Sequence, residues 1–272
     1  MRNEFKVFLS ALALMSVGQV SALETWNWSA SPDNPNPGAA SAVVAGVGTV
    51  TATPTGWADT GSGGAIQQQL GASTTGATHF TIYGGGLGIN NLSGCATASG
   101  SCDVGDIYSS APEHAIDNNQ RYEMVLLSFS TAVKLTQMKM GWAGGADSDM
   151  TVMAYSGATP TLSGKYFTTA SLAGWSVIGN YANVGTNVTN INAGNVSSSY
   201  WLIGAYNPLG TGNVASGFDS GNDYVKLTSV TGCASGSTSA GCTTSRVPEP
   251  GSLALMGVGL IGLLRMRKAR QS

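Results

Sequence analysis

Residues 122–130, YEMVLLSFS, and residues 133–142, VKLTQMKMGW, decide the fold class of this chain. In the second segment Val, Leu and Met nearly alternate with Lys, Thr and Gln, which is the period of a strand with one buried face. The alternation slips at Thr136 and Gln137, where one extra residue in a paired strand would form a β-bulge. The two segments therefore predict two strands, the second of them bulged.

Six other segments carry a β-branched or alternating pattern bounded by Gly, Asn or Asp. They are residues 42–53, 79–84, 150–157, 175–184, 200–207 and 223–232. Residues 84–120 are rich in Gly and are predicted to form a long loop region. Short strands separated by turn residues, with no sustained helical period among them, are typical of a β-sandwich or jelly roll. We therefore expect an all-β fold of eight or more strands.

The chain ends differ in composition from the body and define the predicted domain boundaries. Residues 1–22 carry Arg2 and Lys6 before an apolar run and then small residues, which is the pattern of a secretory signal peptide, here cleaved after Ala22. The other predicted parts are an extended arm containing prolines at 23–40, the β-sandwich at 41–232, a linker rich in Gly, Ser and Thr with a Cys pair at 233–246, and a terminal segment at 247–272.

The charge distribution argues against nucleic acid as a partner. The chain has 12 Lys and Arg and 14 Asp and Glu. Six of the basic residues and one of the acidic residues lie in residues 1–22 and 265–272, so the part between has 6 basic and 13 acidic side chains. Proteins that bind nucleic acid present a basic face to the phosphates, and this acidic body does not supply one.

Four cysteines indicate an oxidising compartment. Cys95 and Cys102 are separated by six residues, and Cys233 and Cys242 by eight. Four cysteines allow three pairings, of which two local disulfides are favoured because each closes a short loop of small residues. The alternative is a zinc site, but these spacings exceed the usual gap between zinc ligands, and no histidine lies beside them.

The sequence lacks the motifs of common hydrolases. It has two histidines, His79 and His114, and neither a G-x-S-x-G nor an H-E-x-x-H motif. Glu113, His114 and Asp117 lie close together in EHAID, where they would form an acid–base group or, as we expect, a hydrogen-bonded loop before a strand. Glycoside hydrolases need two carboxyl groups at a defined separation in space. We predict a protein that is not an enzyme, with glycan hydrolysis ranked third among its functions.

Two acidic loops are candidates for a calcium site. Asp147 and Asp149 lie in ADSDM, and Asp219, Asn222 and Asp223 lie in DSGND. Oxygen-rich loops can hold Ca²⁺, although neither loop matches the EF-hand spacing. The alternative is turn chemistry, in which Asp and Asn cap their own backbone. No other metal or cofactor is predicted.

Trp26 and Trp28 are the candidate carbohydrate contacts. Both lie in ETWNWSASPDNPNP, residues 24–37 of the predicted arm, where their flat rings would be exposed to stack on a sugar. Trp142, Trp175 and Trp201 lie at strand ends and are expected to pack in or around the core.

Residues 115–142, AIDNNQRYEMVLLSFSTAVKLTQMKMGW, are similar to the galactose-binding-like, or discoidin-type, jelly roll. In that family an A-x-D loop precedes a strand, a short turn and a second strand of alternating apolar residues. The later segments TVMAYSG and WSVIGNY continue the likeness, which covers residues 115–232. Members often bind sugars through variable loops, so the resemblance implies a fold and leaves the ligand open.

The last segment, VPEPGSLALMGVGLIGLLRMRKARQS at 247–272, places an apolar run between a Pro-Glu-Pro turn and a basic cluster. The run at 251–264 has 14 residues, whereas a stable membrane span needs about 20. It is apolar on all sides, unlike the last helix of a globular domain. The basic residues that follow fit retention on the cytoplasmic side; they are Arg265, Arg267, Lys268 and Arg270. The segment predicts a transmembrane helix that holds the chain in the membrane only transiently.

Val247, Pro248, Glu249 and Pro250, followed by an apolar helix and terminal arginines, resemble the PEP-CTERM sorting signal of Gram-negative bacteria. The body, in HAIDNNQRYEMVLLSF and GWAGGADSDMTVMAY, also resembles a group called exosortase-dependent surface proteins. The first resemblance implies that exosortase, a membrane transpeptidase, recognises the Pro-Glu-Pro motif, removes the tail and transfers the protein to the cell surface or the exopolysaccharide matrix.

These observations predict a secreted β-sandwich at the cell surface or in the extracellular matrix of a biofilm-forming Gram-negative bacterium. Its predicted role is structural or interactive and non-enzymatic, and the alternative is a carbohydrate-binding module that recognises exopolysaccharide. Exosortase is the predicted transient partner, signal peptidase is a second predicted partner, and exopolysaccharide is a further candidate partner. The membrane is contacted only through the terminal helix.

Overall fold

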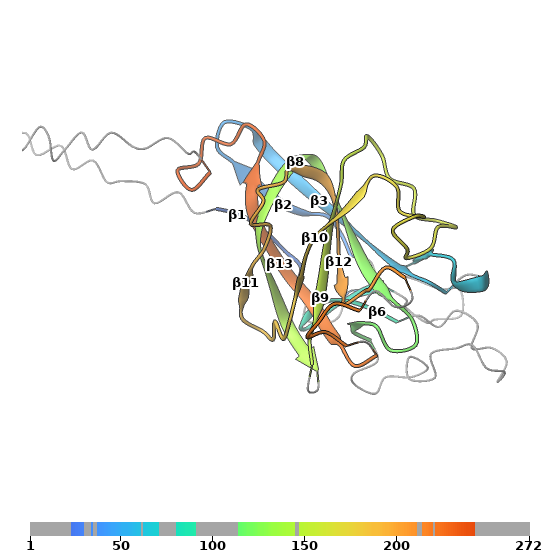
Figure 1. The fold of residues 1–272 in the computed structure, drawn as a ribbon. Helices are drawn as coiled ribbons and strands as arrows, with labels where there is room; N and C mark the ends of the chain where they lie inside the picture. The colour runs from blue at the N-terminus through green and yellow to red at the C-terminus, as the bar shows by residue number, and fades with distance from the viewer. Residues whose placement is uncertain are drawn as a thin grey trace, which may run out of the picture. The chain divides into compact units, whose positions relative to one another are not determined.

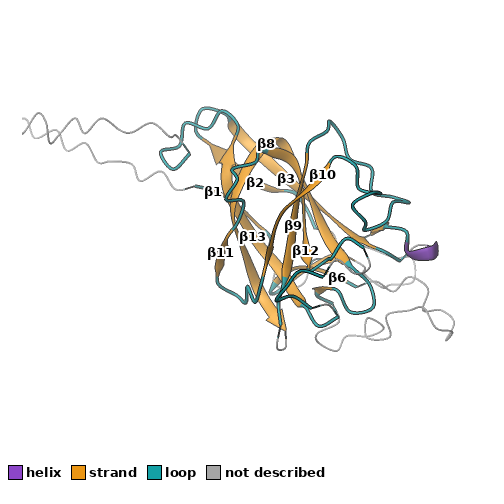
Figure 2. Cartoon of the chain, in the orientation of Figure 1, coloured by secondary structure: helices purple, strands orange, loops and turns teal. Residues whose placement is uncertain are grey.

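The computed structural model describes residues 23–29, 34, 37–60, 62–70, 80–90, 114–144, 147–210, 214–219 and 221–242. All of them belong to one compact unit, Met1–Cys242. Almost all of its regular structure is β-strand, and each pair of strands is antiparallel (Figure 1, Figure 2). The predicted all-β fold is confirmed.

One long strand, β8 (Glu123–Gly144), organises the sheet (Figure 1). Its first part pairs with β3 (Gly48–Ala58) on one side and β12 (Ser198–Ala205) on the other. Its second part pairs with β13 (Tyr224–Ala234) and β11 (Val188–Asn190). The two strands predicted from the opening segments are therefore one continuous strand, which takes part in two different regions of the sheet.

The other strands extend these two regions. β9 and β10 continue outward from β12, β2 and β4 pair with β3, and β1, β6 and β7 pair with β13, while β5 pairs with β6. Their bounds are β1 Glu24–Asn27, β2 Ala40–Val44, β4 Gln67–Gln69, β5 Phe80–Tyr83, β6 Gly86–Ile89, β7 Ile116–Asp117, β9 Met150–Tyr155 and β10 Trp175–Tyr181, with a 3-10 turn, η1, at Ser62–Gly64.

The main core lies between the two regions of the sheet. Trp26 of β1 donates its indole N–H to the carbonyl of Val50 on β3 at 2.9 Å. Its ring also meets Phe129 of β8 edge-on, with the ring centroids 5.0 Å apart. Because β1 is bonded to β13 and not to β3, these contacts cross from one region to the other. The sheet therefore folds over a shared apolar core in the manner of a sandwich.

The β-bulge predicted at Thr136 and Gln137 is confirmed. Along β13 the partner of Thr231 is Gln137, whereas the partner of the next residue, Gly232, is Leu135. Thr136 is the extra residue, and its carbonyl instead accepts from the backbone N–H of Ile191 at 2.8 Å. The bulge lets the second part of β8 bend while it keeps neighbours on both sides.

The single strand predicted at 42–53 is wrong, because the structure has a hairpin of β2 and β3 there. Gly46 and Gly48 have φ angles of 82° and 101°. Backbone in this left-handed region is readily adopted by glycine, which has no Cβ to clash. The two glycines make the turn, and Val44 lies opposite Gly48 at the end of the paired strands.

Two predicted boundaries also differ from the structure. The arm at 23–40 contains β1, which pairs with β13 from Glu24 to Asn27. The linker at 233–246 begins inside β13, since that strand ends at Ala234. In both places the chain contributes to the sheet, because β1 pairs with β13 and the end of β13, at Cys233 and Ala234, pairs with β8.

Several predicted features lie outside the described residues. They are the signal peptide at 1–22, His79, Cys95 and Cys102, Glu113, and the terminal segment at 247–272 with its predicted membrane helix. In the parts of the chain that are described, no helix is long and apolar enough to cross a membrane.

Candidate functional site

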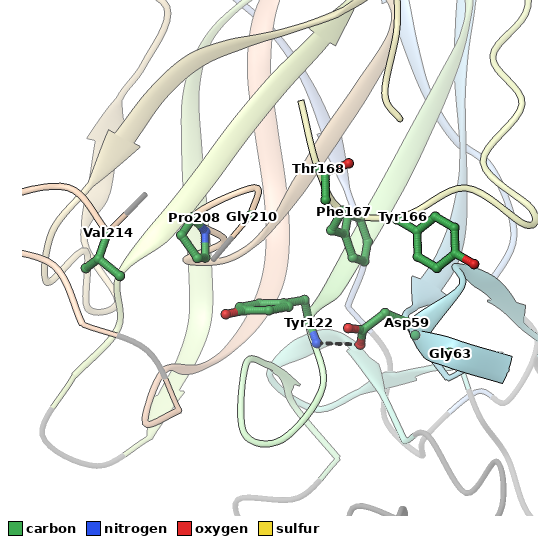
Figure 3. A pocket seen from close by; sticks show the side chains of 10 residues that line it. Asp59, Gly63, Tyr122, Tyr166, Phe167, Thr168, Pro208, Gly210 and Val214 are labelled. Carbon is green, nitrogen blue, oxygen red and sulfur yellow. Dashed lines mark hydrogen bonds between the residues drawn. The ribbon is translucent and has the colours of Figure 1, made fainter. Parts of the chain in front are cut away.

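A pocket opens where β3 ends and β8 begins (Figure 3). These strands are antiparallel with Ala58 opposite Glu123, so the residue after one strand lies beside the residue before the other. The two residues are Asp59 and Tyr122, and the Tyr122 backbone N–H donates to Asp59 Oδ1 at 2.8 Å. The register of the pair thus joins a carboxyl group to an aromatic residue 63 positions away.

Two other segments complete the lining. The loop between β9 and β10 and the chain that follows β12 contribute Tyr166, Phe167, Thr168, Pro208, Gly210 and Val214. The pocket has a volume of about 500 Å³. Sites for small molecules typically measure about 300–1,000 Å³, so the pocket is large enough to hold one.

The aromatic side chains of the pocket differ in how firmly they are held. Phe167 is buried in a second apolar cluster, together with Met124 and Leu162, and the ring of Tyr122 packs against the same cluster. Tyr166, in contrast, is 44% exposed. The pocket therefore combines a fixed apolar wall with one accessible aromatic ring.

Two glycines keep the rim beside Tyr166 open. Gly63 and Gly64 have φ angles of 69° and 84°, a conformation that favours glycine. A Cβ added to Gly63 would lie 3.9 Å from the Tyr166 hydroxyl, and one added to Gly64 would meet no atom within 4 Å. No side chain from this short turn therefore covers the opening.

Asp59 supplies the charge of the pocket. Burial raises the pKa of the Asp59 carboxyl group, while the hydrogen bond from Tyr122 and the positive charge of Arg121 oppose that shift. The Arg121 guanidinium donates to the Asp59 backbone carbonyl at 3.3 Å. Among the described residues the donors to this carboxylate are the backbone N–H groups of Tyr122 and of Asp59 itself, and no side chain donates to it. The pocket thus holds a hydrogen-bond acceptor beside aromatic rings.

The two predicted acidic loops meet in the structure. Asp147 and Asp223 form an isolated β-bridge. One carboxylate oxygen from each of Asp147, Asp149 and Asp219 lies within 4.8 Å of the others, an arrangement of hard oxygen ligands that suits Ca²⁺. Asp223 lies outside this group of three, because its oxygens accept from the Asp149 N–H and from the Asn118 amide, each at 2.6 Å. Calcium itself stays a prediction.

Burial dominates the electrostatics of these acids. It raises the pKa of Asp149 to about 6, opposed by a backbone hydrogen bond from Asn183, and the neighbouring charge of Asp147 adds to the rise. Burial also raises the pKa of Asp223 to about 7, although the Asp149 N–H and Asn118 donate to its carboxylate. Both groups therefore bind protons close to neutral pH, and a cation would compete with those protons.

The prediction that Trp26 and Trp28 are exposed is wrong. Their side chains are 0% and 2% exposed, because β1 adds to the edge of β13 and turns alternate side chains into the core. Both indole N–H groups are also satisfied within the protein, by the carbonyls of Val50 and Gly38. Buried rings have no free face on which a sugar could stack.

One of the two predicted disulfides is present. Cys233 and Cys242 are bonded, with their Cα atoms 5.4 Å apart, so neither offers a thiolate to zinc. The carboxylate of Glu24 lies beside them and accepts from the hydroxyls of Ser237 at 2.6 Å and Ser239 at 2.8 Å. The disulfide loop is thereby bound to β1.

The described part of EHAID is a short turn at His114 and Ala115 that leads into β7, so Asp117 lies in a strand and not in the expected loop. The Asp117 N–H donates to Glu123 Oε2 at 3.1 Å, and Asp117 Oδ1 accepts from Asn119 at 2.9 Å. The His114 ring packs on Tyr83, with the centroids 4.5 Å apart. These contacts give the segment a structural role, because they join Asp117 at the end of β7 to Glu123 at the start of β8 and place His114 against β5.

The sequence prediction missed Asp59, Tyr122 and Tyr166. Asp59 lies in GWADTGSGG, where a strand pattern runs into a turn rich in Gly, and Tyr122 is the first residue of the strand predicted at 122–130. Each residue is unremarkable in its own local sequence. Only the pairing of β3 with β8 places the first two together, and that pairing has no signature within either strand.

One comparison with known protein families gives a result. A model described as the PEP-CTERM protein-sorting motif matches residues 246–268, which confirms the predicted motif at Val247, Pro248, Glu249 and Pro250. The match also includes three of the four predicted basic residues and ends before Arg270. No curated protein and no solved structure matches the chain.

The motif defines a class of exported protein. It implies that exosortase processes the chain, and that the protein lies at the cell surface or outside the cell of a bacterium. It covers the sorting signal alone, so the role of the β-sheet body depends on the geometry described above.

Proposed function

We propose that this chain is a non-enzymatic surface or extracellular-matrix protein of a biofilm-forming Gram-negative bacterium, with a β-sandwich body that interacts with exopolysaccharide. The observation that carries the proposal is the sorting motif at 246–268. An all-β body with a disulfide is well suited to an oxidising, extracellular setting. Signal peptidase, exosortase and exopolysaccharide are the proposed partners.

A discoidin-type jelly roll remains the proposed kind of body. Its support is the sequence likeness over 115–142 together with antiparallel strands in a folded sheet. The fold by itself transfers no ligand.

The sorting proposal is tested by the intact mass of the protein extracted from the cell surface. We expect a mature form that lacks residues 1–22 and residues 253–272, because both terminal signals are removed. Glu249→Ala is expected to retain the tail and to shift the protein to the membrane fraction. A surface protein that still carries 253–272, or a Glu249→Ala variant that is sorted normally, would contradict the proposal.

Binding of carbohydrate is favoured over hydrolysis by the lining of the pocket. Glycoside hydrolases generally use two carboxyl groups about 5–10 Å apart. The described lining residues offer one, Asp59, together with tyrosine and phenylalanine rings. We therefore rank a carbohydrate-binding role second and glycan hydrolysis third. Release of reducing ends from any matrix glycan, lost in Asp59→Asn, would reverse this order.

A further inference from the structure

We propose that the pocket formed by Asp59, Tyr122 and Tyr166 binds a sugar ring that has no carboxyl group, presented by a neutral polysaccharide. The inference rests on the proposed interaction with exopolysaccharide and assigns that interaction to one site. The site differs from the tryptophans that the sequence suggested, since both of those are buried.

The apolar part of the pocket suits one face of a pyranose. A sugar ring presents C–H groups on its faces and hydroxyl groups around its edge. A site that binds it therefore needs an aromatic surface against one face and polar groups beside the edge. Tyr166 is exposed and Tyr122 lies in the wall of the pocket, while Phe167 backs them from the buried cluster. In the view of Figure 3 the Asp59 carboxylate lies between the Tyr122 and Tyr166 side chains.

Asp59 suits the hydroxyl groups at the edge of the ring. Its Oδ1 is fixed by the Tyr122 N–H at 2.8 Å, so the orientation of the carboxylate is set before a ligand arrives. Beyond the backbone N–H groups of Tyr122 and of Asp59 itself, no described residue donates to the carboxylate. Hydrogen bonds to a charged acceptor are stronger than those between neutral groups, and the carboxylate has acceptor capacity left for a sugar hydroxyl.

The shape of the pocket permits a ring to enter from the rim. Its lining converges from four separate parts of the chain, and the glycines of η1 leave the edge beside Tyr166 without a side chain. Its volume of about 500 Å³ fits a compact ligand better than a long chain lying across the sheet. The ring is therefore expected at a chain end or on a branch.

Charge excludes one class of sugar. A uronic acid would bring its carboxylate to Asp59, and like charges repel strongly where water is partly excluded. The part of the chain between the termini also has 13 acidic and 6 basic side chains. We therefore expect neutral glycans to bind and polyuronates to be rejected.

The test uses the full chain, purified in mild detergent, and three probes. Dextran and galactomannan are neutral, alginate is a polyuronate, and each is placed in a native affinity gel, with methyl glycosides of glucose, galactose and mannose as competitors. The wild type should be retarded by at least one neutral glycan and not by alginate. Asp59→Asn keeps an oxygen for the Tyr122 N–H but loses the charge, and we expect about tenfold weaker binding or more.

Tyr166→Ala and Val188→Ala are the matched pair of variants. Both residues are exposed, at 44% and 55%, but Val188 lies on β11, away from the pocket lining. Tyr166→Ala should lose binding, whereas Val188→Ala should bind as the wild type does. Thermal unfolding of each variant separates loss of the site from loss of the fold.

The outcomes separate the site from the proposed function. If the wild type binds a neutral glycan and Asp59→Asn and Tyr166→Ala bind equally well, the pocket is not the site, while an interaction with polysaccharide stands. If the wild type binds neither these glycans nor the matrix polysaccharide of the producing strain, both the site and the proposed interaction are overturned. Preference for alginate would overturn the proposal that the pocket binds a neutral sugar, while an interaction with polysaccharide would stand.

Discussion

Trp26 joins the two regions of the sheet through a single side chain. Its indole N–H donates to the carbonyl of Val50 on β3, its ring meets Phe129 of β8, and its own strand, β1, pairs with β13. A buried polar atom costs free energy unless it finds a partner, and here the partner lies on the opposite region. The residue therefore adds both apolar burial and a hydrogen bond across the core.

Replacing Trp26 by Ala should lower the free energy of unfolding by about 3–5 kcal/mol, because a fully buried aromatic ring is lost and a cavity remains. Denaturant unfolding followed by circular dichroism measures the change. Val188→Ala, on an exposed side chain, should stay within about 0.5 kcal/mol of the wild type. A Trp26→Ala variant as stable as that control would contradict the role of Trp26 in the core.

The acidic loops predict a stability that depends on pH. Burial raises the pKa of Asp149 to about 6 and that of Asp223 to about 7, both above the ordinary value of 3.8. Between that value and neutrality the folded protein holds protons that the unfolded chain has released. Stability is therefore greatest at acid pH and falls as the pH rises through these two pKa values.

Urea unfolding at a series of pH values in EDTA measures this dependence. Asp147→Asn should flatten it, because the Asp147 charge raises both pKa values and the amide oxygen can still accept from Ser148. A free energy of unfolding that rises from acid to neutral pH would contradict the prediction. With EDTA replaced by Ca²⁺ at neutral pH, we expect the wild type to be stabilised and Asp147→Asn to be stabilised less.

At the scale of the elements, local pattern predicted strands better than it predicted their connections. The alternation in β8 identified both its exposed face and the bulge at Thr136, because a bulge shifts the side-chain period within the strand itself. The continuity of β8 was missed, since Thr131 and Ala132 between the two segments carry no strong signal of their own. The β2–β3 turn was missed for a related reason: its glycines sit inside a run of β-branched residues.

The β2–β3 turn should not tolerate a side chain at Gly46. Its φ of 82° costs an L-residue about 1–2 kcal/mol, and a Cβ would lie 2.8 Å from the Thr238 side chain in the disulfide loop. Gly46→Ala is therefore expected to lower the unfolding free energy by at least about 1 kcal/mol. Gly38→Ala, where a Cβ meets nothing within 4 Å, is the matched control and should be neutral. Equal stability of the two variants would rule out the proposed strain.

At the scale of the whole molecule, the sequence predicted the sorting signal of the protein more completely than its candidate binding pocket. The sorting motif is contiguous, so 246–268 could be interpreted without a structure. The two acidic loops could also be predicted as a candidate cation site, because the Asp residues of each loop are close together in the sequence. The pocket could not be predicted, since Asp59, Tyr122 and Tyr166 come from three segments that meet only after β3, β8 and the β9–β10 loop have folded.

The disulfide between Cys233 and Cys242 should stabilise the body. A bond that closes a loop of this length removes chain entropy from the unfolded state worth about 2–3 kcal/mol. Alkylation with and without reductant, followed by mass measurement, should show this pair as oxidised, and reduction should lower the melting temperature. Free thiols at both positions in the unreduced protein, or an unchanged melting temperature after reduction, would contradict the assignment.

The position of that disulfide also determines how the body would respond to force. A protein held by the chain after Cys242 receives tension there, and the disulfide passes the tension to Cys233 within β13. Since β13 is paired lengthwise with β8 and β1, pulling shears many hydrogen bonds together instead of opening them one at a time. Reduction of the disulfide would first allow the chain between Cys233 and Cys242, which are nine positions apart, to extend. The tether would then lengthen by about 25 Å. When the cell is exposed to flow, the intact disulfide would thus transmit force directly to the sheet, and the reduced form would first extend.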